Sequence, residues 1–195
     1  LSDRARHILF VDELTRISGD PALRQRFEQE WLFDLTPDPA DQPDRFLIIT
    51  GQPRVTRDDR PECAQTDVDT TMWAAASGPG GWDDTVPGLA GYCGVAWYRF
   101  TFDVPADFKT ENLVLTLGEI EVVDETFVNG VRVGGTGQFP PEAQPAPGVQ
   151  RIYEVPAEAL RPGQRNVLAI RIFDPDRHGG HRRLPTLRSR LTADE

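Results

Sequence analysis

The sequence predicts a mainly β protein, an antiparallel sandwich preceded by a short helical extension. Beyond residue 44, apolar and polar residues alternate with the period of two that is typical of half-buried strands. Seventeen glycines and seventeen prolines supply the turns that such a fold needs. No helical pattern separates the predicted strands, so neighbouring strands are expected to run antiparallel. A chain of 195 residues has the size of one such domain with an appendage.

The N-terminal part of the chain follows a different pattern. We expect residues 1–44 to form a helical extension with a linker, and residues 45–195 to form the sandwich. One helix is predicted from Asp3 to Ile17, and a second begins at Asp20. The second helix carries an apolar residue at every fourth position, which gives one apolar stripe: Leu23, Phe27, Trp31 and Leu35. The stripe is expected to pack on the rest of the protein, and the alternative is that it binds a protein partner.

The best-defined strand is predicted at Val95–Val104, where Tyr98, Phe100 and Phe102 form an aromatic face. Asn129-Gly130 is the preferred pair for a two-residue hairpin turn, and it joins two β-branched runs. The remaining strands are predicted at Phe46–Ile49, Leu113–Leu117, Thr126–Val133 (the two arms of the hairpin), Arg151–Val155, Asn166–Phe173 and Leu184–Leu191.

Two long stretches, residues 51–69 and 78–94, show no period and are expected to be irregular. Each contains one of the two cysteines, Cys63 and Cys93. The pair either forms a disulfide bridge or remains two unpaired thiols, and the sequence favours neither arrangement. No Cys/His spacing typical of zinc occurs, so a structural zinc site is not expected.

Composition excludes several classes of function. There are 31 acidic against 21 basic side chains, and the net charge of −10 argues against binding to nucleic acid. Apolar runs are only a few residues long, too short to span a bilayer. The chain begins at Leu1 without a charged and apolar leader, which fits a processed mature protein and a trimmed domain equally well.

Several segments together resemble a known family. They are Gly94-Val-Ala-Trp-Tyr-Arg-Phe-Thr-Phe-Asp-Val-Pro105, Asp124-Glu-Thr-Phe-Val-Asn-Gly130 and Asn166-Val-Leu-Ala-Ile-Arg-Ile-Phe-Asp174. With their neighbours over residues 67–180, they resemble the jelly-roll sugar-binding domain of family 2 glycoside hydrolases and the accessory domain of sialate O-acetylesterases. The resemblance implies a galactose-binding-domain-like jelly roll with a carbohydrate ligand, in an extracellular or periplasmic protein. Glu119-Ile-Glu121 stands where these relatives often carry aspartates, so no metal site is transferred.

No catalytic residue is expected in the chain, and neither the catalytic barrel of the glycosidases nor the hydrolase domain of the esterases is present in it. Asp124 and Glu125 are adjacent in a strand, so their side chains point to opposite faces and cannot act as a glycosidase pair. They are interpreted as supporting the hairpin. The loop from Asp174 to His181 combines carboxylates with imidazoles, a mixture that suits neither calcium nor a transition metal, and we interpret it as a solvated turn. No metal or other cofactor is expected.

A sugar site needs an aromatic platform and planar polar side chains on loops. We predict that five residues line one shallow site at one end of the sandwich: Trp82, Gln138, Phe139, Arg171 and Asp174. Trp73 is a further loop aromatic. The alternative for both tryptophans is that they close the end of the sandwich.

The sequence therefore predicts a non-catalytic carbohydrate-binding module that serves as an accessory domain. Two alternatives remain. One is a structural or protein-interaction sandwich without affinity for sugar. The other is a fragment of a larger glycosidase or carbohydrate esterase.

Overall fold

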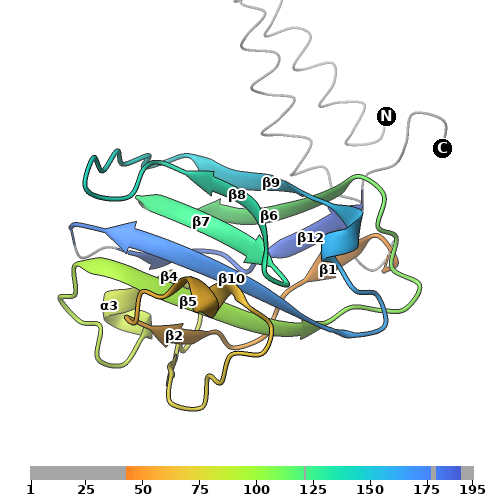
Figure 1. The fold of residues 1–195 in the computed structure, drawn as a ribbon, viewed down its shortest axis with the longest axis horizontal. Coiled ribbons are helices and arrows are strands. Elements are labelled where there is room, and N and C mark those ends of the chain that lie inside the picture. The colour runs from red at the N-terminus through yellow and green to blue at the C-terminus, as the bar shows by residue number, and fades with distance from the viewer. Residues whose placement is uncertain (1–42, 121, 177–178, 190–195) are drawn as a thin grey trace, which may run out of the picture. The chain divides into compact units, whose positions relative to one another are not determined.

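The computed structural model describes residues 43–120, 122–176 and 179–189 (Figure 1). The helices predicted in the first 35 residues, and the end of the strand predicted at Leu184–Leu191, lie outside these ranges. The domain boundary predicted after residue 44 therefore stays a prediction. Within the described ranges, no helix has the length and hydrophobicity that crossing a membrane requires.

Twelve strands and three short helical segments make up the described part of the chain. The strands are β1 (Phe46–Ile48), β2 (Arg54–Thr56), β3 (Ala74–Ala75), β4 (Gly80–Gly81), β5 (Gly94–Asp103), β6 (Leu113–Glu119), β7 (Val123–Val128), β8 (Val131–Thr136), β9 (Gln150–Val155), β10 (Arg165–Asp174), β11 (Gly180–His181) and β12 (Thr186–Ser189). The helical segments are η2 (Pro61–Ala64), α3 (Trp82–Thr85) and η3 (Ala157–Ala159). Every strand predicted from the alternation is present, with small differences at the ends, and the mainly β prediction is confirmed.

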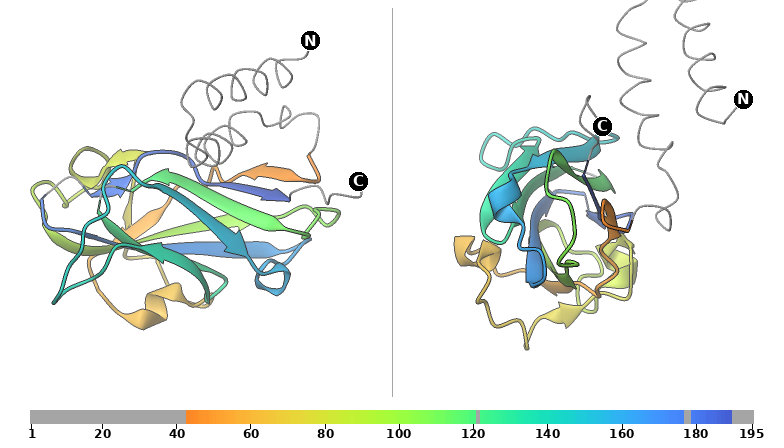
Figure 2. Two further views of the ribbon diagram at one scale, coloured as in Figure 1. Left: turned by 90° about the horizontal axis from the view of Figure 1, so that it is seen from above. Right: turned by 90° about the vertical axis from the view of Figure 1, so that its right-hand side faces the viewer.

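The strands form two large antiparallel sheets and one small one. One large sheet has the order β1-β12-β6-β9, the other has the order β3-β2-β5-β10-β7-β8, and β11 pairs with β4. The strands of both large sheets lie lengthwise across Figure 1 and the left view of Figure 2. Neighbours such as β5 and β10 pair over ten residues, from Asp103 opposite Arg165 to Gly94 opposite Asp174. The long register fixes which residues of β10 face the core, since a strand exposes alternate residues on each side.

One hydrophobic core lies between the two large sheets. Phe100 of β5 and Ile170 of β10 contribute from one sheet, and Leu115 of β6 and Leu187 of β12 contribute from the other. All four side chains are fully buried. Burial of a side chain of this size contributes roughly 1.5–3 kcal/mol to the free energy of unfolding. The side chains that the alternation places in the core are therefore also the main source of stability.

The predicted hairpin turn between β7 and β8 is confirmed. Asn129 and Gly130 have φ values of 49° and 84°, and positive φ at both central residues is what a type I′ turn requires. The Asn129 side chain also crosses to β10, where its Oδ1 accepts a hydrogen bond from the Val167 amide at 2.9 Å. Its Nδ2 donates to Asn166 Oδ1 at 2.6 Å. Asn129 therefore joins the turn to the neighbouring strand as well as shaping it.

A segment outside the six-stranded sheet was expected to be irregular but adds a further layer. Residues 57–73, here called the strap, contain η2 and follow β2, which pairs with β5. Figure 2 (left) shows the strap on the opposite side of this sheet from β1 and β12. The strap covers Trp97 and Arg99, which point away from the core as the alternation predicts but are nevertheless buried. The Arg99 guanidinium donates to the Cys63 carbonyl at 3.0 Å and to the Thr66 carbonyl at 2.9 Å.

The two cysteines are not bridged. Cys63 belongs to the strap and is buried, Cys93 is exposed, and both are free thiols. Burial raises the pKa of the Cys63 thiol, which favours its neutral form.

Candidate functional site

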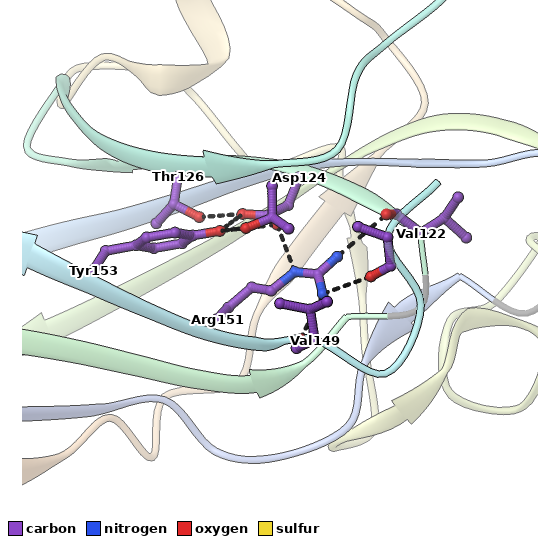
Figure 3. Close-up of polar contacts among 8 residues, drawn as sticks. Val122, Asp124, Thr126, Val149, Arg151 and Tyr153 are labelled. Carbon is purple, nitrogen blue, oxygen red and sulfur yellow. Dashed lines mark hydrogen bonds and ion pairs between the residues drawn. The ribbon is translucent and has the colours of Figure 1, made fainter. Parts of the chain in front are cut away.

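A buried ion pair joins the two large sheets at the end where the loop between β8 and β9 begins (Figure 3). Asp124 of β7 and Arg151 of β9 meet at 2.8 Å, and both side chains are fully buried. The Tyr153 hydroxyl donates to both carboxylate oxygens of Asp124, at 3.0 and 2.8 Å. Thr126 Oγ1 donates to the same carboxylate at 3.0 Å. Burial raises the pKa of the Asp124 carboxyl, and the hydrogen bonds from Arg151, Tyr153 and Thr126 oppose that rise.

Arg151 also holds the end of the loop that follows β8 and the residue that precedes β7. Its guanidinium donates to the carbonyls of Val149 at 2.5 Å, Ala146 at 2.9 Å and Val122 at 3.2 Å. These carbonyls belong to residues on both sides of β8, so one side chain connects them to the core. Residues 137–149, here called the β8–β9 loop, are therefore positioned by a buried charge rather than by surface contacts alone.

On the outer face of the six-stranded sheet, Arg171 is the centre of a second polar cluster. Its Nε and Nη2 donate to the two carboxylate oxygens of Asp59 in the strap, at 2.7 and 2.6 Å. Its Nη1 donates to Glu125 of β7 at 3.1 Å. The hydrogen bonds from Arg171 lower the pKa of Asp59, and burial only partly opposes them. The same contact raises the pKa of Arg171, so both groups stay charged over a wide pH range.

The β8–β9 loop meets this cluster through Phe139. The Arg171 guanidinium carbon lies 4.0 Å from the centre of the Phe139 ring. Phe173, two residues further along β10, lies 6.3 Å from Phe139 between ring centroids. Phe139 is half-buried by these contacts, whereas Gln138 is exposed. The backbone of Gln138 exchanges two hydrogen bonds of 3.0 Å with Gln144, which closes the loop on itself.

The five residues predicted to line one site divide between the two faces of the six-stranded sheet. Phe139 and Arg171 meet on the outer side, and Gln138 is exposed in the β8–β9 loop beside Phe139. Trp82 and Asp174 are fully buried, and neither has surface to offer a ligand. Asp174 shares the core-facing side of β10 with residues 168, 170 and 172, and its Oδ1 accepts a hydrogen bond from the Asp176 amide at 2.5 Å.

Trp82 takes the alternative role predicted for it, because its ring closes one end of the core. The indole Nε1 donates to the Tyr92 carbonyl at 3.2 Å. Gly179 lies directly against the ring, where a Cβ on that glycine would come within 2.4 Å of it. Trp73 is the last residue of the strap, is half-buried, and packs with Cys63 and Trp97.

Asp124 and Glu125 point to opposite faces of β7, as predicted. Asp124 lies between the sheets, and Glu125 lies outside with Arg171 and also meets Arg132 at 3.4 Å. Among the residues that the structure describes, no group of three or more His, Cys, Asp or Glu side chains is arranged to hold a metal ion.

One feature that the sequence analysis missed is a cavity of about 360 Å³. Its lining comes from residues 50–53 and 76–79 together with Phe100, His181 and Leu184. These segments are far apart in the sequence, and only His181 had drawn attention, as part of the polar loop after β10. No local pattern predicts such a site, because the fold alone brings its parts together.

Comparisons with known proteins agree with this architecture. A family model described as "Beta-galactosidase second all-beta domain" matches residues 58–178. No curated protein sequence matches the chain. Among solved structures, a glycosyl hydrolase family 2 member from Bacteroides cellulosilyticus DSM 14838 is 18% identical, with a TM-score of 0.58, and the match covers 74% of this chain and 20% of that one.

Two further solved structures are similar in the same way. A calcium-binding mutant of Bacteroides uniformis beta-glucuronidase 2 is 19% identical with a TM-score of 0.58, over 73% of this chain and 18% of that one. A beta-glucuronidase from Ruminococcus gnavus is 15% identical with a TM-score of 0.57, over 73% and 28%. These likenesses show the fold, and the chain spans between 18% and 28% of the length of these three proteins. The resemblance to an all-β accessory domain of family 2 glycoside hydrolases is confirmed, and the chain belongs to the family of beta-galactosidase second all-beta domains.

Proposed function

We propose that this chain is a non-catalytic accessory domain that binds carbohydrate through its β8–β9 loop. The observation that carries the proposal is the place of Phe139. Its ring is backed by Arg171 and Phe173 and stays partly exposed next to the exposed amide of Gln138. An aromatic ring beside a planar amide offers a sugar both a surface for its C–H face and partners for its hydroxyls.

The buried ion pair supports the same proposal, because a binding loop must hold its shape before the ligand arrives. Arg151 fixes two carbonyls near the end of the β8–β9 loop, Ala146 and Val149, from inside the molecule. Arg171 fixes the Phe139 ring from the outer face and is itself held by Asp59. The proposal assigns no catalytic residue.

We further propose that the fold is a galactose-binding-domain-like jelly roll. Its support is the way in which the chain alternates between the two large sheets. β1, β6, β9 and β12 belong to the four-stranded sheet, and β5, the β7–β8 hairpin and β10 lie between them in the chain and belong to the other. Such alternation is what distinguishes a jelly roll from two sheets that each form from one continuous segment. An extracellular or periplasmic location is part of this proposal, as for the carbohydrate-binding domains that it resembles.

Binding to a panel of immobilised oligosaccharides and polysaccharides tests the function. Phe139→Ala should weaken binding by about 1–2 kcal/mol, the size of other aromatic contacts. Met72→Ala is the control, since Met72 is 94% exposed on the strap and has no place in the loop. A Phe139→Ala variant that binds a verified glycan as tightly as the parent would contradict the assignment of the loop.

The alternative is a structural or protein-interaction sandwich without affinity for sugar. The observation that favours it is that the solved family 2 enzyme matched above is about five times as long as the matched part, so a segment of this kind can serve as one part of a larger molecule. A separate alternative is that the chain is a fragment of a larger glycosidase or carbohydrate esterase. Under the interaction alternative the chain captures a protein through the helices predicted in residues 1–44. Absence of binding to every glycan in the panel would favour it, and the length of the native reading frame would identify a fragment.

A further inference from the structure

The Phe139 ring of the proposed sugar site contacts a connected group of charged side chains. The Arg171 guanidinium carbon lies 4.0 Å from the centre of the ring. Arg171 donates to the two carboxylate oxygens of Asp59 in the strap at 2.7 and 2.6 Å, and to Glu125 of β7 at 3.1 Å. Glu125 also meets Arg132 of β8 at 3.4 Å. Two positive and two negative charges are therefore joined in one group that reaches the ring.

These charged side chains are at the surface, where a ligand can reach them. The side chains of Arg171 and Asp59 are 24% and 37% exposed, and that of Glu125 is 29% exposed. Phe139 is only half-buried and belongs to the same surface. A sugar that rests on the ring therefore lies within the electric field of the charged group.

The pairing leaves this group without net charge. Hydrogen bonds from Arg171 lower the pKa of Asp59, and the same contact raises the pKa of Arg171, so both side chains are charged at neutral pH. The positive charge of the guanidinium is thus already matched inside the protein. A sugar carboxylate placed here would approach Asp59 and Glu125, which have the same sign, and would also lose part of its hydration.

A neutral sugar is compatible with the same arrangement. An arginine has five N–H donors, and the contacts of Arg171 with Asp59 and Glu125 use three of them. Carboxylate oxygens have several lone pairs, so each can accept from more than one donor. Sugar hydroxyls both donate and accept, and they can therefore bind to the charged group without separating its ion pairs.

We propose that Asp59 determines the specificity of the β8–β9 loop for uncharged sugars. Its carboxylate neutralises Arg171 beside Phe139 and so excludes sugars that carry a carboxylate of their own, such as uronic acids. This inference rests on the proposed function, because it concerns which ligand the same loop accepts. It assigns the choice of ligand to the strap, which contributes Asp59 from outside the six-stranded sheet.

Binding of two pairs of sugars to the full chain, followed by NMR or calorimetry, tests the inference. The pairs are glucose with glucuronic acid and galactose with galacturonic acid, whose members differ only at C6. The parent should bind the neutral member of at least one pair, and bind it more tightly than the acidic member. Asp59→Asn keeps the shape of the side chain and leaves one positive charge unmatched. The affinity for the acidic sugar relative to the neutral one should then rise about five- to tenfold, the effect of a unit charge about 6–8 Å away at an effective dielectric constant of about 40.

Two further variants keep the test independent of how well Asp59→Asn folds. Asp58→Asn is the matched control, because it removes the same charge from the next residue of the strap, whose partner is Arg60 at 2.7 Å, and should leave the preference unchanged. Glu125→Gln removes the other carboxylate from Arg171 and should shift the preference in the same direction as Asp59→Asn.

The salt dependence of binding distinguishes a change of charge from a loss of structure. Salt screens exposed charges, so the affinity that Asp59→Asn gains for the acidic sugar should fall as the salt concentration rises, while the affinity for the neutral sugar stays the same. A loop that has merely lost its shape would bind both sugars more weakly at every salt concentration.

The outcomes separate this inference from the proposed function. A parent that binds neutral and acidic sugars equally well, and loses both when Phe139 is replaced by alanine, supports the β8–β9 loop and overturns the inference. The inference is also overturned if Asp59→Asn and Glu125→Gln leave the preference as it is in the parent, or if Asp58→Asn changes it as much. Absence of binding by all four sugars at millimolar concentrations, in the parent and in the variants, overturns both.

Discussion

Asp124→Asn should be one of the most destabilising single-atom changes in this protein. The substitution keeps the shape of the side chain but removes the charge that faces Arg151, and both groups are 0% exposed. Loss of one partner from a fully buried ion pair typically costs about 3–5 kcal/mol, because the remaining charge has no water to solvate it. For a domain of this size, 1 kcal/mol corresponds to roughly 2–4 °C, so the melting temperature should fall by about 6–20 °C.

The matched control is the same substitution in an exposed ion pair. Asp103 and Arg165 meet at 3.4 Å with side chains 75% and 73% exposed, and pairs of this kind contribute about 0–1 kcal/mol. Urea denaturation followed by tryptophan fluorescence measures both variants at pH 7. If Asp124→Asn costs no more free energy of unfolding than Asp103→Asn, the buried pair does not stabilise the junction of the two sheets and the reasoning is refuted.

Three other substitutions should show how much the remaining contacts contribute to stability. His181→Asn should flatten the pH dependence of stability. Burial lowers the pKa of His181 below its ordinary 6.5, so below about pH 6.5 the unfolded chain binds more protons than the folded one, and the parent loses stability as the pH falls. Urea titrations at several pH values measure this difference between the parent and the variant. Asp59→Asn should lower the free energy of unfolding by about 1–2 kcal/mol at pH 7. Because the pKa of Asp59 is lowered from 3.8, this difference between parent and variant should vanish as the pH falls through the lowered value. An unchanged difference in strong acid would contradict this. Gly134→Ala should cost about 1–3 kcal/mol in thermal melts, since its Cβ would lie 2.2 Å from Tyr153, whereas Gly78→Ala has open space and should stay within about 0.5 kcal/mol; equal melting temperatures would refute the steric argument.

The large strands were predictable because each satisfies a local rule that its tertiary contacts also satisfy. In β5, alternation places Phe100 in the core, and at the turn after β7, Asn129-Gly130 adopts the positive φ values that the dipeptide favours. β2 was missed because three residues carry too short a pattern to detect. Its strand character comes from pairing with β5, which no property of residues 54–56 reveals.

The candidate site was harder to predict than the fold, for a reason that Trp82 and Arg171 illustrate. A tryptophan in a glycine-rich loop has the same sequence signature whether it contacts a ligand or closes a core, and the packing of Gly179 against its ring decides the matter here. Arg171 was correctly predicted to point outward from β10. Its partners Asp59 and Glu125 were not predicted, because Asp59 lies 112 positions away in a stretch without a period.

The strand order of the four-stranded sheet affects how the protein folds during its synthesis. β12 lies between β1 and β6, although it is the last of the described strands to be synthesised. Phe46 pairs with Arg188, so the growing chain must carry β1 and β6 with unpaired edges until residue 189 has left the ribosome. Such long-range closure is slow and exposes strand edges that other chains can join. Chains that stop before Thr186 should therefore be substrates for chaperones and proteases rather than partly working domains.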